Sequence, residues 1–520
     1  MDTYDDAAYD RFRSELVNAG FSPVHDDDLP RWTGPIRASL RSLTDATRMQ
    51  IRFYPGWPLR YAHVFVAGLK TEHDAQGTIC LWAEDDPAQI DGRELNALWD
   101  RLDQWAAAAR QGFAPVDRAL DAYRLYVDQN TFAAELPLRE LIDGGSDGYA
   151  AELFATVQGE ALLIDHGNPP DPRTIGKAVL HGAFYLRADV DVPPRTFDDV
   201  RAALSRHQRR HLDRGLARRS AVSLNEPSGG HDFVVLAWPR HDDDHDAVVL
   251  GFAGTHDTLQ ASVMAPTSND IASLRRRAGP DADLLADKTV LLAGVGSVGG
   301  HVAVAIASSG VGTLHLWDSD RLTSVNLVRH VCSRQHVGYK KTHAVGHVVT
   351  QHAPWCAVTH HDDLPYGPHE LQAAIEGADL VIDCTGIFSI TAALAETCRR
   401  STVPLINGAL YHHGALARVQ RQADGDTLIA ARQSDAKYLP LPAEDQSPAT
   451  AGFLELGCTA PVNNAPPIAV LSIAADIACA AVDLLTDRCE RPDERITVLR
   501  TMGPPFDRRG TLDPHLSVDV

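Results

Sequence analysis

The chain has 520 residues, 44% of them apolar and 22% charged, which is the composition of a globular protein of roughly two to four domains. Its 48 basic and 69 acidic residues give a net charge of −21, which argues against nucleic acid or an anionic membrane as a partner. No charged-then-apolar segment opens the chain, and its eight cysteines form no Cys-x-x-Cys pair. We therefore expect a cytoplasmic protein with reduced thiols, no zinc held by such pairs, and protein partners.

The first 115 residues are predicted to form an α+β unit. Apolar spacing near residues 7–18 predicts a helix, and alternation over residues 49–53 predicts a half-buried strand. A second strand is expected at residues 61–66. A closing helix would place five apolar side chains on one face, namely Leu95, Leu98, Trp99, Leu102 and Trp105.

A proline-rich turn and a cysteine loop lie within this unit. Residues 54–58 read Tyr-Pro-Gly-Trp-Pro, and a loop runs from His73 through Gly77 to Cys80. This series resembles the ubiquitin-conjugating fold over residues 1–112. The resemblance implies that Cys80 carries an acyl group as a thioester, which stays open to attack by an amine. A buried structural cysteine is the alternative. Eukaryotic members steady the oxyanion with an Asn that is absent after His73, so backbone N–H groups or His73 itself are expected to serve.

Residues 116–270 carry no readable catalytic motif and are predicted to form a linker domain. Apolar runs at residues 161–165 and 182–186 predict strands of an α/β or β-rich unit. Residues 201–219 predict a basic helix, either a solvated face or a dock for an acidic partner. Residues 240–246, Arg-His-Asp-Asp-Asp-His-Asp, are interpreted as a solvated hairpin loop rather than a metal site.

A glycine loop follows the apolar run at residues 289–293. Gly294, Gly296 and Gly299 lead into a stretch with helical period, so the loop would present backbone N–H groups and the helix dipole to an anion. The next strand is followed by Asp318, which is placed for a ribose hydroxyl. This pattern alone fits any doubly wound nucleotide-binding domain, including a nicotinamide-dependent dehydrogenase.

The polar residues that follow are more specific than the glycine loop. They are Asp320, Asn326, Arg329 and Lys341. Attack on an α-phosphorus needs such donors around three phosphates, whereas hydride transfer does not. Their order resembles the ThiF and ubiquitin-activating superfamily. The resemblance implies that ATP is bound with Asp318 on ribose, Asn326 and Arg329 on phosphates, and Lys341 on the β- and γ-phosphates, with Lys340 as the alternative to Lys341.

One position departs from the pattern of that superfamily. The strand at residues 378–383 ends in Asp383, and Gly386 stands where the superfamily places a second Asp that holds Mg²⁺. We predict Asp383 as the metal ligand. Asp320, or the phosphates of ATP themselves, are the alternatives, because Mg²⁺ keeps several waters.

A cysteine near the C-terminus completes the resemblance. Cys458 precedes Pro466-Pro467 and an apolar helix at residues 468–485, which we interpret as a core-packed helix and not a membrane span. The resemblance implies that Cys458 receives the activated carboxylate, and a nearby helix N-terminus would favour its thiolate. Cys384 and Cys479 are less well placed.

The predicted α/β architecture has an N-terminal α+β ubiquitin-conjugating-like domain (1–115), a linker domain (116–270) and a doubly wound ThiF-type adenylation domain (271–520). The whole resembles the fused activating and conjugating proteins of bacterial CBASS antiphage operons. This implies ATP and Mg²⁺ as cofactors, a homodimer completed by an Arg from Arg275–Arg277, a target amine, and a partner with a free C-terminus: a cGAS-like nucleotidyltransferase or a ubiquitin-like protein. A sulfur-carrier adenylyltransferase, a nicotinamide-dependent oxidoreductase and an inactive scaffold stay open.

Overall fold

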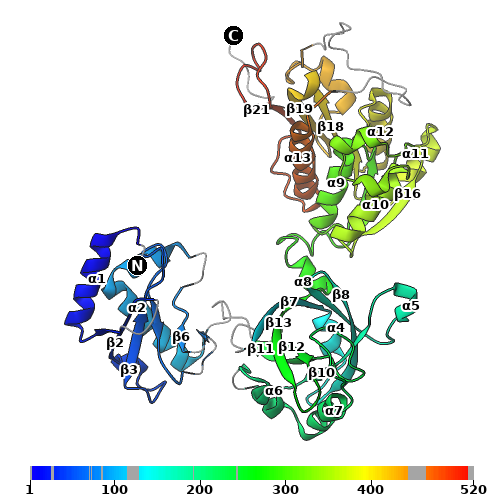
Figure 1. Cartoon of the computed structure of the whole chain (residues 1–520). Coiled ribbons are helices and arrows are strands. Elements are labelled where there is room, and N and C mark those ends of the chain that lie inside the picture. The colour runs from blue at the N-terminus through cyan, green and yellow to red at the C-terminus, as the bar shows by residue number, and fades with distance from the viewer. Residues whose placement is uncertain are drawn as a thin grey trace. The chain divides into compact units, whose positions relative to one another are not determined.

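The computed structural model divides the chain into two compact units, Met1–Asp270 and Ile271–Val520. Figure 1 labels their elements. The predicted division near residue 115 stays a prediction. The structure describes residues 3–24, 29–69, 71, 73–75, 77–82, 86–113, 128–190, 193–241, 244–442 and 464–512.

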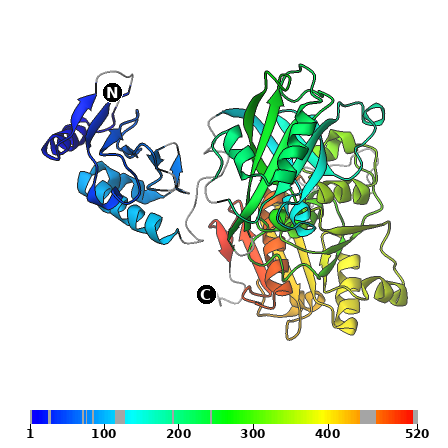
Figure 2. The same ribbon diagram turned by 90° about the horizontal axis from the view of Figure 1, so that it is seen from below.

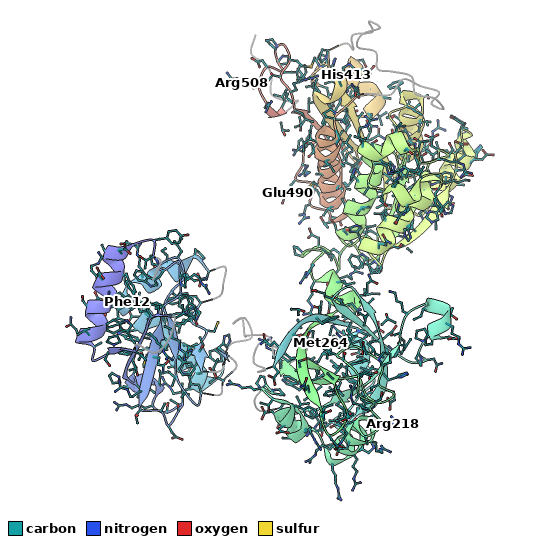
Figure 3. All side chains as sticks on the ribbon, viewed as in Figure 1. Phe12, Arg218, Met264, His413, Glu490 and Arg508 are labelled. Carbon is teal, nitrogen blue, oxygen red and sulfur yellow. The ribbon has the colours of Figure 1, made fainter. Side chains whose placement is uncertain are left out.

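The first part of the N-terminal unit is a six-stranded sheet with the strand order β1-β2-β3-β4-β6-β5. Helix α1 (Asp6–Asn18) begins after Asp5, whose carboxylate accepts the Ala8 N–H, and it buries Phe12 in the core (Figure 3). Helix α2 (Leu95–Gln111) buries all five predicted apolar side chains, which confirms that helix. The strands are β1 (Ser22–Val24), β2 (Arg31–Pro35), β3 (Arg48–Arg52), β4 (His63–Phe65), β5 (Asp74–Ala75) and β6 (Thr78–Ile79).

The second part of this unit is a closed barrel with the strand order β10-β11-β12-β13-β7-β9-β8 (Figures 1 and 2). The β-rich prediction is therefore confirmed. Closure comes from β8, which pairs antiparallel with β10. The elements are β7 (Gln129–Leu136), α4 (Leu138–Asp143), β8 (Ala150–Gln158), β9 (Ala161–His166), α5 (Pro172–Ile175), β10 (Leu180–Leu186), α6 (Phe197–Ala203), α7 (Arg206–Leu216), β11 (Phe233–His241), β12 (Asp244–Ala253) and β13 (Gln260–Ser268).

Alternate residues of the barrel strands pack in two separate clusters. Phe184, Val235 and Met264 belong to one cluster (Figure 3 labels Met264), while Tyr185 and Val234 pack in another with Leu212 and Leu216 of α7.

The predicted single basic helix over residues 201–219 was wrong. Two helices occupy it, because Ser205 caps α7 through a capping box with Gln208 and thereby ends the preceding helix. Strands β11 and β12 form the predicted hairpin, but they extend into residues 240–246, which the sequence predicts as its loop.

The C-terminal unit is built on one eight-stranded sheet with the order β16-β15-β14-β17-β18-β19-β20-β21. Its first five strands are parallel and the rest antiparallel. The elements are α8 (Ile271–Arg275), β14 (Thr289–Ala293), α9 (Ser297–Ser308), β15 (Thr313–Trp317), α10 (Lys341–His352), β16 (Ala357–His361), α11 (Pro368–Ile375), β17 (Leu380–Asp383), α12 (Phe388–Ser401), β18 (Leu405–Tyr411), β19 (Leu416–Gln422), α13 (Pro467–Leu485), β20 (Glu494–Val498) and β21 (Gly510–Leu512).

Helices cover both faces of this sheet, as the doubly wound prediction requires. One core cluster combines residues of α9, α10 and α13, and another combines residues of α11 and α12. Helix α13 is long and apolar enough to cross a membrane, but Ile473, Ile477 and Ala481 are fully buried in the first cluster. It is thus the core-packed helix that the sequence predicts.

Candidate functional site

The glycine loop joins β14 to α9, and its first and last glycines are required by geometry. Gly294 has φ +81°, and a Cβ there would meet the Thr385 backbone at 2.9 Å. A Cβ on Gly299 would lie 1.9 Å from the Gly294 carbonyl oxygen, so only glycine lets the helix approach the loop. The space beside Gly296, which precedes α9, is open. The N–H groups of the first turn of α9 therefore face a position that suits a phosphate.

Two side chains hold the centre of the loop at Val295. Its N–H donates to Oδ2 of Asp318 (3.0 Å), and its carbonyl oxygen accepts a hydrogen bond from Nε2 of His330 (3.0 Å). His330 is 7% exposed, and burial lowers its pKa to about 4. Burial also raises the pKa of Asp318, against the opposing charge of Lys341. Sequence reasoning missed His330, which no motif spacing marks.

The two adjacent lysines have different partners. Nζ of Lys341 lies 2.6 Å from Oδ2 of Asp320 and 3.7 Å from Oδ1 of Asp318. Nζ of Lys340 instead pairs with Asp362 at 2.5 Å. The side chain of Lys341 is only 13% exposed. The geometry favours Lys341 over Lys340 as the cation of this site, because it meets the two strand-end carboxylates.

Asn326 lies within a short 3₁₀ helix (Ser324–Val328) after β15, and Arg329 follows it directly. Oδ1 of Asn326 accepts the N–H and hydroxyl of Thr323, which fixes the amide on the turn. Nη1 of Arg329 donates to the Ala465 carbonyl oxygen (3.3 Å). Arg329 thus lies beside the segment that begins α13. Both residues are in the same connection between β15 and α10 as Lys341.

Asp383 does not fit a Mg²⁺ ligand. It is fully buried, and its Oδ1 accepts two hydrogen bonds from Thr385, the N–H at 2.9 Å and the hydroxyl at 2.7 Å. Its Oδ2 accepts the hydroxyl of Thr391 and, at 3.0 Å, the side-chain amide of Asn407. These four hydrogen bonds fix the orientation of the carboxylate next to the glycine loop. Asp320, one alternative, is exposed and pairs with Lys341, and the phosphates of ATP themselves are the other alternative for the metal.

Gly386 has φ +68°, with open space where its Cβ would be. An acidic side chain would have space at this position, but in a backbone conformation that side chains other than glycine's rarely adopt. Arg275 is also engaged within its own unit, donating to the Ala282 carbonyl oxygen at 2.6 Å and lying 5.7 Å from the Trp355 ring. A contribution of Arg275 to a second subunit stays a prediction.

Cys80 ends the hairpin of β5 and β6. Its N–H donates to the carbonyl oxygen of His73 (3.0 Å), so the two predicted residues face each other across the hairpin. The His73 ring is 6% exposed and packs on Phe113. Cys80 is partly exposed, unlike a core cysteine.

Tyr61 is a neighbour of Cys80 that sequence reasoning missed. Burial raises the pKa of Tyr61 to about 12, and the nearby Cys80 thiol adds a smaller effect in the same direction. The phenol is therefore protonated at neutral pH and can donate a hydrogen bond close to the thiol. No sequence signal marks it.

Cys458 lies outside the described residues. The described chain resumes at Asn464, on the edge of a groove of about 1190 Å³ beside α13. The exposed apolar side chains Ile468 and Leu471 and the cations Arg500 and Arg509 line this groove. Among the other thiols, burial raises the pKa of Cys384, which argues against a nucleophile there.

Comparison with known proteins covers the C-terminal half. The model of the ThiF family matches residues 268–486. The uncharacterized protein y4oA of Sinorhizobium fredii (strain NBRC 101917 / NGR234) is 29% identical over 263 residues, which cover 46% of this chain and 44% of that protein. The molybdopterin-synthase adenylyltransferase of Escherichia coli (strain K12) is 33% identical over 145 residues, 28% of this chain and 58% of that protein. A solved structure of E. coli MccB with MccA-N7isoASN aligns at a TM-score of 0.36 and 18% identity, covering 45% of this chain and 66% of that one.

The chain thus spans about half the length of the curated relatives it matches. Its C-terminal half contains a ThiF-family domain, which confirms that part of the predicted resemblance. The resemblance of the N-terminal part to the ubiquitin-conjugating fold stays a prediction.

Proposed function

We propose that the C-terminal half of this chain uses ATP to adenylate the C-terminal carboxylate of a protein partner, and that the acyl group then passes through Cys458 and Cys80 to an amine. The partner class is a cGAS-like nucleotidyltransferase or a ubiquitin-like protein, and the setting is antiphage defence.

One observation carries the adenylation step. The glycine loop, the N-terminus of α9, Asp318 and Lys341 converge at the carboxyl ends of β14 and β15. Nucleotides bind at this edge of doubly wound sheets, where helix N-termini supply N–H donors. The ThiF-family match over residues 268–486 and the similarity to an adenylyltransferase support the same reaction.

The proposed chemistry is an in-line displacement followed by acyl transfers. A carboxylate oxygen of the partner bonds to the α-phosphorus of ATP, and the bond from that phosphorus to the bridging oxygen breaks, which releases pyrophosphate. Lys341 and Arg329 neutralise charge on the phosphates. The thiolate of Cys458 attacks the acyl carbon and expels AMP. The Cys80 thiolate takes the acyl group and frees Cys458, and an amine then displaces Cys80 and loses a proton to form the amide.

No protein residue is assigned to Mg²⁺ in these steps. When bound, the ion would neutralise phosphate charge, and the phosphates of ATP themselves can hold it, because Mg²⁺ retains most of its waters. The role assigned to Lys341 requires only that its ammonium move from Asp320 to the phosphates.

The groove beside α13 supports a peptide tail as the substrate. Arg500 and Arg509 provide positive charge, and Ile468 and Leu471 provide apolar surface. Asn464 and Pro466 line this groove, and Arg329 donates to the carbonyl oxygen of Ala465 between them, which connects the groove to a residue proposed to bind the phosphates. A tail in the groove would reach the donors of the phosphate site with its carboxylate.

A second candidate is a sulfur-carrier adenylyltransferase, which the similarity to the molybdopterin-synthase enzyme favours. It would use the same nucleotide site but has no role for Cys80. A nicotinamide-dependent oxidoreductase would use the glycine loop without Asn326, Arg329 or Lys341.

The test is exchange of labelled pyrophosphate into ATP by the full chain, with the proteins encoded beside its gene supplied one at a time. We expect exchange only with a partner whose C-terminal residue is intact. Absence of exchange together with binding of NADH would contradict adenylation. A Cys80→Ser variant that traps the partner as an ester would support acyl transfer through residue 80. A sulfur-carrier adenylyltransferase would form no such ester, because it does not use Cys80.

A further inference from the structure

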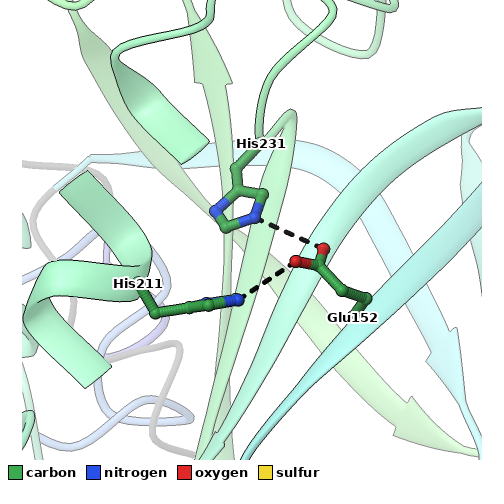
Figure 4. A group of neighbouring side chains, drawn as sticks. All are labelled: Glu152, His211 and His231. Atoms are coloured by element: carbon green, nitrogen blue, oxygen red, sulfur yellow. Dashed lines mark hydrogen bonds and ion pairs between the residues drawn. The ribbon is translucent and has the colours of Figure 1, made fainter. Parts of the chain in front are cut away.

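Three potential metal ligands meet where α7 packs on the barrel. Glu152 comes from β8, His211 from α7 and His231 from the connection before β11. Nε2 of His211 lies 3.0 Å from Oε1 of Glu152, and Nε2 of His231 lies 3.5 Å from Oε2. Figure 4 shows the carboxylate between the two imidazole rings.

The position of the His231 ring requires a glycine at residue 215. Its N–H donates to the Gly215 carbonyl oxygen, and its own carbonyl oxygen accepts from Arg219. A Cβ on Gly215 would lie 2.0 Å from the imidazole ring. Arg219 also forms a buried ion pair with Asp232, the next residue, which fixes this connection. The chain therefore specifies the location of this ring closely.

The same imidazole lacks a hydrogen-bond partner among the described residues. His231 is 1% exposed, and neither of its ring nitrogens makes a hydrogen bond to a described residue. Nε2 has only a long ion pair, 3.5 Å from Oε2 of Glu152. Buried polar groups without partners are uncommon in native proteins and call for an unseen water or ion.

His211 is oriented for the same point. Its Nδ1 lies 3.1 Å from the hydroxyl of Tyr185, a fully buried residue of β10. Without a metal, Nε2–H donates to Oε1 of Glu152 and Nδ1 accepts from the hydroxyl; with an ion bound, the hydroxyl can instead accept from Nδ1–H, which frees the lone pair of Nε2 for the metal. Metal-bound histidines commonly have their second nitrogen fixed in this way.

We propose that Glu152, His211 and His231 bind a zinc ion that fastens α7 and the connection before β11 to strand β8. The three ligand atoms lie within 4.8 Å of one another. Tetrahedral zinc with bonds of about 2.0 to 2.1 Å needs separations of roughly 3.4 Å, which small side-chain movements reach. Two imidazoles and one carboxylate are ligands that zinc accepts, and the exposed Glu152 leaves the fourth position to water.

This site lies outside residues 268–486 and is independent of the proposed adenylation. Its test is a competition titration of the full, untagged, metal-free chain with Zn²⁺ against a chromophoric chelator. A parallel titration with Co²⁺ reports the ligand type, because the spectrum should show d–d bands without thiolate charge transfer. Wild type should bind one ion per chain tightly, and its thermal midpoint should rise when Zn²⁺ is added.

His211→Ala should abolish this binding, and His207→Ala, on the exposed turn before it, is the matched control that should retain it. Tyr185→Phe, which removes only the partner of Nδ1, should weaken binding about 10- to 100-fold. Absence of Zn²⁺ binding by wild type, or equal binding by wild type and His211→Ala, would overturn the proposal. If His211→Ala fails to fold, Tyr185→Phe and the wild-type spectrum still decide the question.

Discussion

Replacing Lys341 with alanine, beside a matched Lys340→Ala variant, tests the proposed adenylation site most directly. The two lysines are adjacent in sequence, so the pair controls for general effects on charge and folding. Nζ of Lys341 lies 2.6 Å from Asp320 and 3.7 Å from Asp318 in a largely buried position, whereas Lys340 pairs with the exposed Asp362. Only the first lysine is expected to reach the phosphates.

The expected loss follows from the charges at the site. A cation about 4 Å from a phosphate charge contributes about 4 kcal/mol at an effective dielectric of about 20. Removing Lys341 also leaves Asp318 and Asp320 unopposed beside the incoming phosphates. We expect pyrophosphate exchange to fall about 10²- to 10³-fold, the loss typical of removing one donor to developing charge. Lys340→Ala breaks one exposed ion pair, worth about 0.2 to 1 kcal/mol, and should change the rate less than threefold.

The assay is partner-dependent exchange of labelled pyrophosphate at saturating ATP, with ATP affinity measured by calorimetry. Urea unfolding of both variants checks that the fold is intact. Equal losses in the two variants, or a larger loss for Lys340→Ala, would refute the assignment of Lys341 as the phosphate cation.

Three further predictions follow from the geometry. Gly299→Ala, whose methyl group would strike the glycine loop at 1.9 Å, should lower stability by about 1 to 3 kcal/mol in thermal unfolding, whereas Gly296→Ala, with open space around it, should not. Tyr61→Phe should slow aminolysis of a thioester on Cys80 at least tenfold in a gel assay with added lysine, and an unchanged rate would exclude Tyr61 as the donor. The pKa of His330 is about 4 in the fold and about 6.5 when unfolded. The free energy of unfolding should therefore fall by about 3 kcal/mol as pH drops from 6.5 towards 4. A His330→Asn variant should show a flatter pH dependence of the urea midpoint.

Local patterns predicted the elements of the C-terminal unit well. The sequence places a strand, a glycine turn and a helix in order, and Gly294 needs its positive φ there for the chain to turn. The apolar face of α2 was equally readable, since spacing alone specifies it. Such patterns depend on residues that are close in the sequence, so they can be recognised without knowledge of the fold.

Features made by distant residues could not be predicted. The barrel closes through pairing of β8 with β10, which no local pattern encodes. Glu152 and His211 meet although they lie 59 positions apart in the sequence. The break at Ser205 is the exception, because the Ser-x-x-Gln capping box was present in the sequence as a signal for a new helix.

Asp383 shows why residue type at a motif position does not decide a role. A carboxylate at the end of a central parallel strand is placed for a metal, and the sequence alone supports that interpretation. Its hydrogen bonds come from residues two, eight and 24 positions away, and the last donor, Asn407, belongs to the neighbouring strand β18. With four donors satisfied, Asp383 would have to give up buried hydrogen bonds to hold an ion, at a cost of about 1 to 3 kcal/mol for each donor left unpaired. Its effect on the nucleotide is therefore expected to be positional, since a Cβ on Gly294 would touch the Thr385 backbone that Asp383 holds in place.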